Sequence, residues 1–388
     1  MRFIDNGDLK NKRILVRVDF NVSLNPDGTI SNDERIKQTL PTLTYLLENN
    51  NTLILMSHLG NPKGVDEKFS LIPIAARLQE YLPNYKIVLR NLEVIRNEAN
   101  SSELYHSTQD KNTIVLLDNL RFNPGEKANY PEFAKQLASL ADAYVNDAFS
   151  ASHRPHASIV GIPLYLPSFA GFLFKKEVEM LKKATENPLK PVVAILGGAK
   201  ISTKLKLIGR FIDIADTVIL GGGLAHNFFL AKGLNIGKSI SEPSEIEHTK
   251  ELLKLAWDKN VNLVLPTDVV IQEGELQKIN DVSDADQIFD IGIESQAHYT
   301  KLILEAKTII WNGPVGYFED PRYRHGTDSV FDAIVKNEGA TSILGGGDTL
   351  AAIAGRPGRE KITHVSTAGG AMLEFIENGT LPGIEALN

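Results

Sequence analysis

The chain of 388 residues is longer than one ordinary hydrophobic core accommodates, so its length predicts two domains. Apolar residues make up 43% and charged residues 23% of it, a globular composition that excludes a disordered, collagen-like or coiled-coil protein. The formal net charge of −7 argues against a general nucleic-acid-binding protein, because the phosphate backbone attracts positive charge; the absence of cysteine excludes disulfides, thiolate catalysis and cysteine-ligated metal sites.

The N-terminal segment, residues 1–8, contains no apolar run, so we expect no secretory signal and a cytoplasmic protein. The longest stretch without Asp, Glu, Lys or Arg is 155–174, which is long enough to span a bilayer. It contains three prolines, however, and we interpret it as a buried connecting segment. No contact with a membrane is therefore expected.

Ten short apolar runs rich in β-branched residues alternate with helix-sized amphipathic segments along the chain. The runs predicted to be strands are 13–18, 52–56, 86–89, 113–117, 143–145, 192–196, 217–220, 262–265, 308–311 and 341–344. Such runs are typical of strands covered on both faces, and their alternation with helices predicts parallel sheets with crossover connections. The predicted fold class is therefore α/β, with two doubly wound parallel-sheet lobes.

The segment 168–187 is predicted to be a hinge helix that joins the two lobes. Phe174, Val178 and Leu181 recur at helical spacing, and two prolines follow and end the helix. An ordinary surface helix fits the same pattern. The predicted domains are residues 1–167 and 188–375.

Basic and imidazole side chains follow the predicted strands of the first half. In open α/β sheets, ligands bind beyond the carboxyl ends of the strands, so these side chains are expected to converge. They are Arg17, Arg35, His58, Arg121 and Arg154. The planar guanidinium group suits carboxylate and phosphate oxygens. One such arginine alone is more simply explained as a surface ion-pair residue, but their recurrence at strand ends predicts a site for a small polyanion.

Glycine follows the predicted strands of the second half. Gly197-Gly198, Gly221-Gly222-Gly223 and Gly345-Gly346-Gly347 each come directly after a strand, and Gly369-Gly370 form a further pair. Glycine at this place lets backbone N–H groups approach phosphate, and the next helix offers its positive end. One such pair is usually only a tight turn, whereas four in one lobe predict a nucleotide site.

Two lysines and one aspartate stand beside these glycines. Lys200 and Lys204 are spaced i, i+4 at the predicted start of a helix, which would place both amines on one face. A solvated lysine pair is the plain alternative, but beside Gly197-Gly198 we favour phosphate contact. Asp348 is a candidate partner of Mg²⁺, directly or through water; the N-cap of the next helix is the plain alternative, and the two roles are compatible.

Seven motifs of the chain, in order and over nearly its whole length, resemble the phosphoglycerate kinase family. They are Arg-Val-Asp-Phe-Asn-Val at 17–22, Ser-His-Leu-Gly at 57–60, Asn-Leu-Arg-Phe at 119–122, Asp-Ala-Phe at 147–149 with His-Arg at 153–154, Gly-Gly-Ala-Lys at 197–200, Trp-Asn-Gly-Pro-Val-Gly at 311–316 and Gly-Gly-Gly-Asp-Thr at 345–349. The first and the sixth are highly specific. The resemblance implies a monomeric two-lobed enzyme that transfers a phosphoryl group reversibly between 1,3-bisphosphoglycerate and ADP, a phosphotransferase with a carboxyl group as acceptor.

The resemblance also implies the roles of individual residues. The substrate, 3-phosphoglycerate, would bind in the first lobe, on which residues 376–388 would pack back, to Arg17, Asp19, Asn21, Arg35, His58, Leu59, Gly60, Asn61, Arg121 and Arg154. ADP or ATP with Mg²⁺ would bind in the second lobe to Gly198, Lys200, Lys204, Gly222, Gly223, Gly292, Asn312, Pro314, Glu319, Gly346, Gly347, Asp348 and Thr349. Arg35 and Lys200 would be the catalytic residues, and Asp348 would hold the metal directly or through water.

Three departures from the family pattern concern the ligands. Asn61 stands where the family usually has arginine, which removes a positive charge that Lys63 could supply instead. Phe-Ser-Ala-Ser at 149–152 replaces the usual Phe-Gly-Thr-Ala, and Ala368 replaces the first of three glycines. None of these departures removes a matched catalytic group.

The reaction implied needs positioning and charge neutralisation more than covalent help, and closure of the lobes would exclude water.

Two other classes of protein share parts of the pattern. A two-lobed anion-binding protein should carry a secretory signal and lack the glycine-rich strand ends. A nicotinamide dehydrogenase should carry a strand-linked G-x-G-x-x-G, which is missing here.

Overall fold

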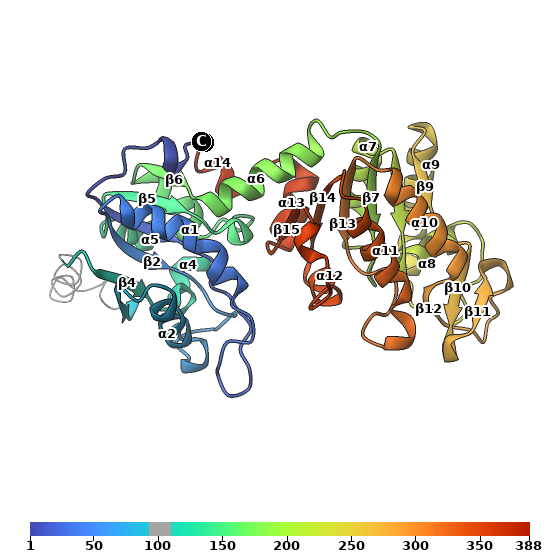
Figure 1. Ribbon diagram of the computed structural model, residues 1–388, viewed down its shortest axis with the longest axis horizontal. Coiled ribbons are helices and arrows are strands. Elements are labelled where there is room, and N and C mark those ends of the chain that lie inside the picture. Colours follow the sequence, from blue (N-terminus) through green and yellow to red (C-terminus); the bar gives the residue numbers. More distant parts are fainter. Residues whose placement is uncertain (93–109) are drawn as a thin grey trace. The chain divides into compact units, whose positions relative to one another are not determined.

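A computed structural model describes residues 1–92 and 110–388 and divides them between two units, each built on a six-stranded parallel sheet. Unit 1 consists of Met1–Glu179 together with Thr380–Asn388, and unit 2 consists of Met180–Gly379 (Figure 1). The predicted fold class, α/β with two doubly wound parallel sheets, is confirmed. The boundary falls inside one helix, α6, and the C-terminal residues return to unit 1.

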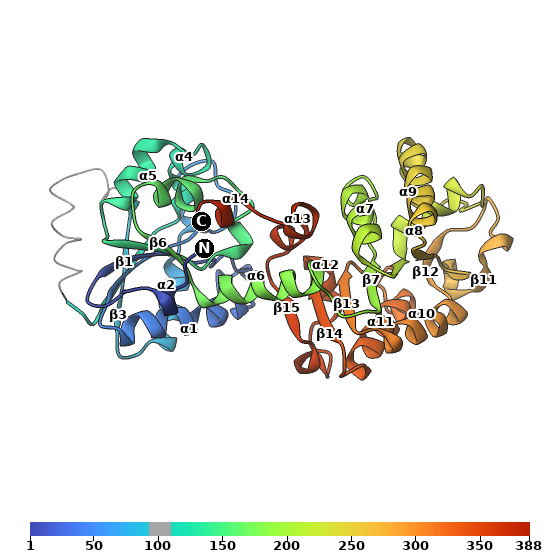
Figure 2. The same cartoon turned by 90° about the horizontal axis from the view of Figure 1, so that it is seen from above.

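The sheet of unit 1 has the strand order β3-β4-β2-β1-β5-β6. Its strands are β1 (Arg13–Arg17), β2 (Thr52–Met56), β3 (Lys86–Arg90), β4 (Thr113–Leu117), β5 (Ala143–Asn146) and β6 (Ser168–Ala170). Every residue of β2 and β4 is buried, as continuous apolar runs require when helices cover both faces of the sheet. Figure 2 shows helices α1 (Glu34–Glu48) and α5 (Pro131–Ala138) on opposite sides of it.

The sheet of unit 2 has the strand order β15-β14-β13-β7-β8-β9. Its strands are β7 (Val192–Leu196), β8 (Thr217–Leu220), β9 (Asn262–Val264), β13 (Thr308–Asn312), β14 (Thr341–Gly345) and β15 (His364–Ser366). Trp311 in β13 is fully buried in the core of this unit. Figure 2 shows α7 (Leu205–Ile214), α8 (Gly222–Ala231) and α9 (Ile246–Asp258) on one side of the sheet, and α10 (Ile293–Glu305) and α11 (His325–Lys336) on the other.

All ten predicted strands are present, but the structure adds strands that the sequence did not predict. The short strands β6 and β15 complete the two parallel sheets. A separate antiparallel sheet, with the order β11-β10-β12, also belongs to unit 2. Its strands are β10 (Asp268–Ile271), β11 (Leu276–Lys278) and β12 (Ile288–Ile291). These strands are three or four residues long, which is too short for their alternation of burial to stand out in the sequence.

The predicted helix 168–187 is shorter in the structure, where α6 spans Phe172–Thr185. Residues 168–170 instead pair with β5 as strand β6, and Gly171 makes the turn between the two elements. The buried Asp147 carboxylate then accepts hydrogen bonds from the backbone N–H groups of Leu173 and Phe174, at 3.0 and 3.2 Å. These bonds satisfy two donors at the helix N-terminus, so the helix begins where the cap lies and not where the apolar spacing begins.

The structure describes five further α-helices. They are α2 (Ile72–Tyr81), α4 (Pro124–Lys127), α12 (Gly347–Ala352), α13 (Gly370–Asn378) and α14 (Pro382–Glu385). In unit 1, the N–H of Gly383 in α14 donates to the carbonyl of Ser152 at 2.9 Å. Within the part of the chain that is described, every helix is too short or too polar to cross a membrane.

The strand order of each sheet reverses next to its first strand. In unit 1 the chain leaves β1 towards β2 but leaves β5 towards β6, on the other side. In unit 2 it leaves β7 towards β8 and β13 towards β14. Ligands of open α/β sheets bind at such a switch point, in the crevice beyond the carboxyl ends of the two diverging strands. The segments after β1 and β5, and those after β7 and β13, are therefore the places to look for a site.

Close backbone packing at the switch point of unit 2 gives a first prediction. A Cβ atom at Gly197 would overlap the backbone carbonyl of Pro314, whereas one at Gly339 would meet its nearest neighbour at an ordinary 3.9 Å. Gly197→Ala should therefore lower the stability of unit 2 by about 1–3 kcal/mol, the cost of overpacking a well-packed site. Thermal unfolding compares it with Gly339→Ala, for which no loss is expected. Equal midpoints for the two variants would contradict the close approach.

Candidate functional site

Unit 1 gathers polar side chains at the switch point between β1 and β5. Asp19 follows β1, and its carboxylate forms an ion pair with Arg35, the second residue of α1. Ser150, in the segment after β5, donates its hydroxyl to the same carboxylate. The backbone N–H of Asn21 also donates to it, at 3.1 Å. These contacts hold the Arg35 guanidinium at the sheet edge, where such a group binds carboxylates and phosphates.

His58, which follows β2, lies beside Arg17 at the end of β1. The Arg17 NH2 group lies 3.1 Å from His58 Nδ1, and because a guanidinium can only donate, Nδ1 is the acceptor. The same nitrogen lies 3.8 Å from Asp19 Oδ1. A neutral imidazole that accepts at Nδ1 carries its proton on Nε2. His58 can therefore offer an N–H donor to an anion.

Burial and nearby charges set the protonation of this cluster. Burial alone would raise the pKa of Asp19, but the Arg35 guanidinium and its other neighbours hold that pKa well below its usual range. Burial lowers the pKa of His58 well below 6.5, and the guanidinium groups of Arg17 and Arg121 lower it further, against the attraction of Asp19. At neutral pH the cluster thus contains a carboxylate, a neutral imidazole and guanidinium cations.

The fully buried carboxylate of Glu126 fixes Arg17 through Ser158. Arg17 Nε donates to Ser158 Oγ at 2.9 Å, and Ser158 Oγ donates in turn to Glu126 Oε1 at 2.6 Å. The backbone N–H of Ser158 donates to the second oxygen of Glu126 at 3.0 Å. A buried guanidinium that is bonded on both sides keeps one orientation, which fixes the direction of His58.

Hydrogen bonds also fix the loop after β2. The backbone N–H of Gly60 donates to Asn21 Oδ1 at 2.9 Å, and Arg121 NH1 donates to the Gly60 carbonyl at 2.6 Å. The carbonyl of Leu59 accepts from Asn119 Nδ2 at 2.7 Å. Arg121 Nε is buried and has no hydrogen-bonding partner among the described residues. Buried donors are normally paired, so an unpaired one at this place is unusual.

The rim of this cluster is exposed and includes Asn61 and Arg154. Lys127, the last residue of α4, donates its ammonium to Asn61 Oδ1 at 3.0 Å. The cation in contact with Asn61 is therefore Lys127, 66 residues further along the chain, and not the neighbouring Lys63. No local sequence signal predicts this pairing, because α4 and the loop after β2 meet only in the fold.

Unit 2 has a cavity of about 360 Å³ at its own switch point. The glycine-rich loops after β7, β13 and β14 and the start of α13 form its walls. They contribute Gly197, Gly198, Ala199, Lys200, Thr203, Lys204, Asn312, Gly313, Gly346, Gly347, Asp348, Thr349, Gly369, Gly370 and Leu373. Gly346 has a φ of 107°, which favours glycine, and it is the N-cap of α12, so the positive end of that helix lies at the cavity.

Lys204 is the cation best fixed in this cavity. Its ammonium donates to Asn312 Oδ1, and Asn312 Nδ2 donates to the Gly345 carbonyl at 2.6 Å. Burial lowers the pKa of Lys204 to about 8, against the attraction of Glu377 and Asp348. The amine is therefore mostly charged at neutral pH, and its positive charge is only partly neutralised by the fold, as a binding site for an anion requires. Lys200 is exposed at the mouth of the same cavity.

Two predictions about local structure here are wrong. Helix α7 begins at Leu205, so Lys200 and Lys204 do not share a helical face but come from the irregular segment before the helix. Asp348 lies inside α12, whose N-cap is Gly346, and its side chain makes no capping bond. Residues 201–204 instead form a turn before the helix, which the Lys204 N–H closes by donating to the Ile201 carbonyl at 2.8 Å.

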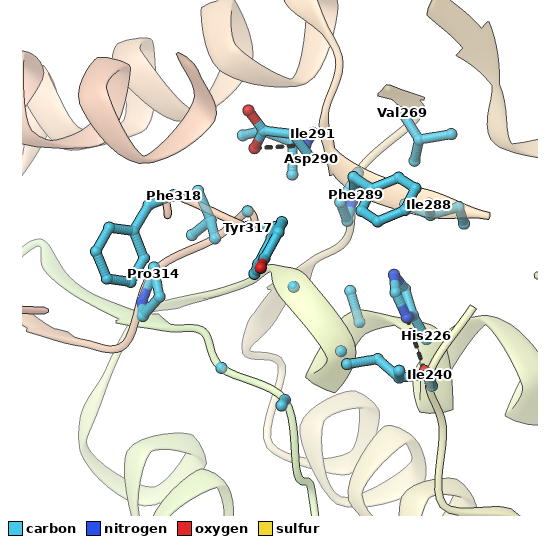
Figure 3. A pocket seen from close by; sticks show the side chains of 18 of the residues that line it. His226, Ile240, Val269, Ile288, Phe289, Asp290, Ile291, Pro314, Tyr317 and Phe318 are labelled. Carbon is cyan, nitrogen blue, oxygen red and sulfur yellow. Dashed lines mark hydrogen bonds between the residues drawn. The ribbon is translucent and has the colours of Figure 1, made fainter. Parts of the chain in front are cut away.

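A second cavity of unit 2, about 500 Å³ in volume, is mostly apolar, and Figure 3 shows side chains that line it. It adjoins the first cavity. The two share Gly198, Ala199 and Asp348. Its walls come from α8, the antiparallel sheet and the segment after β13, and they include Gly222, Gly223, His226, Ile240, Val269, Ile288, Phe289, Pro314, Tyr317 and Glu319. A mostly apolar cavity next to a cradle of glycine amides suits the flat base of a nucleotide whose phosphates lie on the amides.

Most residues that the resemblance assigned to the nucleotide line one of these cavities, but Gly292 lines neither. It is the N-cap of α10, and a Cβ atom there would overlap the Asp268 side chain. The hydroxyl of Thr349 is engaged within the fold, where it accepts from Gly313 N–H at 2.7 Å and donates to the Gly345 carbonyl at 3.0 Å.

The sequence missed the residues that wall the apolar cavity. His226, Phe289 and Tyr317 come from elements far apart in the chain, and two of them belong to or adjoin the antiparallel sheet that was not predicted. It also missed the buried pair Glu126 and Ser158. A buried acidic residue in a short helix has no signal in the sequence that separates it from an exposed one.

No group of three or more His, Asp or Glu side chains suited to a metal occurs within residues 1–92 and 110–388. The single carboxylate of Asp348, exposed at the junction of the two cavities, is compatible with Mg²⁺ that arrives with a nucleotide. Mg²⁺ usually keeps several waters and is held by one or two carboxylates plus substrate phosphates.

Comparison with known proteins gives a consistent result. The family model described as phosphoglycerate kinase matches residues 4–379. The phosphoglycerate kinase of Dictyoglomus turgidum is 44% identical over 387 residues, which cover 98% of this chain and 96% of that protein. That of Moorella thermoacetica is 44% identical over 388 residues, with 98% and 97% covered.

Solved structures agree. The phosphoglycerate kinase of Coxiella burnetii superposes with a TM-score of 0.90 at 40% identity, with 99% of this chain and 98% of that chain covered. The enzyme from Pyrococcus horikoshii gives a TM-score of 0.81 at 32% identity, with 100% and 98% covered.

The protonation of His58 gives a second prediction. Because burial lowers its pKa well below 6.5, its imidazole should stay neutral, with the proton on Nε2, as the pH falls through 6.5. His248, which is exposed and bonded to Glu245, has a raised pKa and should gain its proton in the same range. Nitrogen-15 NMR of the histidine rings during a pH titration checks both. A midpoint near 6.5 for His58 would contradict the buried cluster.

Proposed function

The chain belongs to the phosphoglycerate kinase family, and from this premise we propose that unit 1 binds 3-phosphoglycerate and unit 2 binds the adenine nucleotide with Mg²⁺. The chain catalyses the reaction of that family, the reversible transfer of a phosphoryl group from 1,3-bisphosphoglycerate to ADP. The observation that carries the assignment of ligands is that each unit has the matching group of residues at the switch point of its own parallel sheet. We propose that a single chain is sufficient for the reaction.

In the proposed substrate site, cations and neutral donors meet a ligand that carries both a carboxylate and a phosphate. Arg35, Arg121 and Arg154 would bind the anionic oxygens, and His58 would donate from Nε2. Asp19 cannot contact an anion favourably; its part is to hold Arg35 by an ion pair that persists at neutral pH. Asn21 positions Gly60 and with it the loop after β2.

In the proposed nucleotide site, the glycine loops and Lys204 would bind the phosphates, and the apolar cavity would hold the base. Glu319, at the edge of that cavity, would accept hydrogen bonds from ribose hydroxyls. Asp348 would hold the Mg²⁺ that accompanies the nucleotide, and the metal would neutralise charge on the phosphates.

The chemical step needs no nucleophile from the protein. A terminal oxygen of ADP attacks the acyl phosphorus of 1,3-bisphosphoglycerate, the bond from phosphorus to the acyl oxygen breaks, and 3-phosphoglycerate leaves as a carboxylate. Arg35 and Lys200 would neutralise charge on the phosphoryl group as it moves between the two oxygens. Exclusion of water prevents hydrolysis of the acyl phosphate.

Two substitutions are expected to impair different steps, one the chemical step and the other nucleotide binding. Arg35→Ala should lower kcat by far more than tenfold and leave ADP binding unchanged, because its charge acts mainly in the transition state. Lys204→Ala should weaken ADP binding at least about tenfold, the value of a charge-assisted hydrogen bond, and leave 3-phosphoglycerate binding unchanged. Calorimetry with each ligand and a coupled ATP-consumption assay measure these effects.

Neighbouring lysines provide the controls: Lys37→Ala on α1 and Lys206→Ala on α7 remove a charge of the same sign beside each position. A kcat for Arg35→Ala within about tenfold of wild type, about 1.4 kcal/mol, would reject its catalytic role. Equal weakening of both ligands by Lys204→Ala would reject the division of ligands between the units.

The contact between Lys127 and Asn61 predicts which cation acts at the rim of the substrate site. Lys127→Met should raise KM for 3-phosphoglycerate a few-fold, and more at low ionic strength, because an exposed charge is screened by salt. Lys63→Met is the matched control, because Lys63 is also exposed and lies near Asn61 in the sequence. It should have little effect. Addition of Asn61→Arg to Lys127→Met should restore the affinity. A larger effect of Lys63→Met than of Lys127→Met would contradict the assignment.

A further inference from the structure

The apolar cavity of unit 2 contains one polar group whose partner within the fold fixes its hydrogen-bonding role. His226 lies on α8 and is 4% exposed. Its ring is stacked against Phe229, with 6.5 Å between the centroids. Figure 3 shows it at the cavity wall, with one nitrogen directed to the carbonyl of Ile240 and the other on the opposite side of the ring.

The contact with Ile240 determines the tautomer. His226 Nδ1 lies 2.8 Å from the carbonyl oxygen, which can only accept, so Nδ1 carries the proton. Burial lowers the pKa of His226 to about 4, so the ring is neutral under physiological conditions. In a neutral ring protonated at Nδ1, the other nitrogen is an acceptor.

That acceptor has no partner in the part of the chain that the structure describes. Nε2 makes no hydrogen bond to another described residue, and it is not among the fully buried unpaired atoms. It is therefore accessible, and the space that it borders is the cavity. An acceptor set in a mostly apolar wall is satisfied only by a donor that a ligand or a water brings.

Asp290, another polar residue of the cavity wall, already has hydrogen-bonding partners within the fold. The Asp290 carboxylate accepts from the N–H groups of Gly326 and Ile291, at 2.8 and 2.9 Å. His226 also lies four residues beyond Gly222, about one helical turn or 6 Å from the glycine loops. It is thus set back from the phosphate end, and phosphate groups have no donor to offer it.

We propose that His226 selects the base of the nucleotide by accepting a hydrogen bond at Nε2 from the 6-amino group of adenine. A 6-oxopurine would present an acceptor to this acceptor and would be disfavoured. This specificity rests on the proposed nucleotide site in unit 2. Adenine and a 6-oxopurine differ by one hydrogen-bond donor at position 6 in otherwise similar rings. A fixed polar group in an apolar pocket discriminates well between ligands that differ in this way.

The test compares three diphosphates that differ at position 6: ADP, purine riboside 5′-diphosphate, which has hydrogen there, and inosine 5′-diphosphate, which has oxygen. The wild-type chain should bind ADP about 2 to 10 times more tightly than purine riboside diphosphate, the range of one neutral hydrogen bond, and inosine diphosphate should bind more weakly than ADP. In His226→Leu, the ratio of ADP to purine riboside diphosphate should fall to about one. Tyr317→Phe, which removes a different polar group from the same cavity, should keep the wild-type ratio.

A measurement on the wild-type chain covers the case in which His226→Leu does not fold, which 3-phosphoglycerate binding and circular dichroism would reveal. The nitrogen-15 signal of His226 Nε2 should shift when ADP binds and should not shift when purine riboside diphosphate binds. An unchanged ratio in folded His226→Leu, or an equal Nε2 shift with both ligands, would overturn the proposal; the equal shift would point to a ribose hydroxyl as the donor.

Failure of the nucleotide site itself would look different. In that case Lys204→Ala would leave ADP binding unchanged. If Lys204→Ala weakens ADP while His226→Leu leaves the ratio as it was, the site is correct and the role of His226 is wrong.

Discussion

In each unit the chain leaves two adjacent middle strands in opposite directions, and the segments that follow diverge at the carboxyl edge of the sheet. Everything of functional interest follows from this constraint. Side chains that would otherwise be scattered over a hundred residues are brought to one edge, as with Asp19 after β1 and Ser150 after β5. In unit 2 the same reversal lets the backbones at Gly197 and Pro314 pack so closely that a side chain does not fit between them.

In the proposed sites, the two units would hold anions by different physical means. Unit 1 would use guanidinium groups that carboxylates fix, half-buried Arg35 on Asp19 and buried Arg17 on Glu126 through Ser158. Unit 2 would use backbone amides, the start of a short helix and the half-buried ammonium of Lys204. Side-chain forks suit a small ligand with a carboxylate and a phosphate, whereas an amide cradle suits a phosphate chain that lies along the backbone.

Two buried histidines, His58 and His226, differ in whether the ring offers a hydrogen-bond donor or an acceptor. Both are neutral because burial lowers their pKa, but their neighbours select different tautomers. A guanidinium donates to Nδ1 of His58 and leaves Nε2 as a donor, which suits an anion. A carbonyl accepts from Nδ1 of His226 and leaves Nε2 as an acceptor, which suits an amino group. The difference lies entirely in the partner of one ring nitrogen.

The sequence by itself determined the ten main strands, the α/β class, the two groups of residues at strand ends and the family. These follow from local signals: apolar runs of strand length, glycines directly after them, and strings such as Trp-Asn-Gly-Pro-Val-Gly at 311–316. The tertiary structure decided the start of α6 at the Asp147 cap, the position of Lys204 before α7, the contact of Lys127 with Asn61 and the walls of the apolar cavity. Each of these depends on which atoms from distant segments meet. Hydrophobic periodicity reports whether a side chain faces inward, but a hydrogen bond, a tautomer or a cavity wall depends on what lies opposite it, and that is set only when the layers pack.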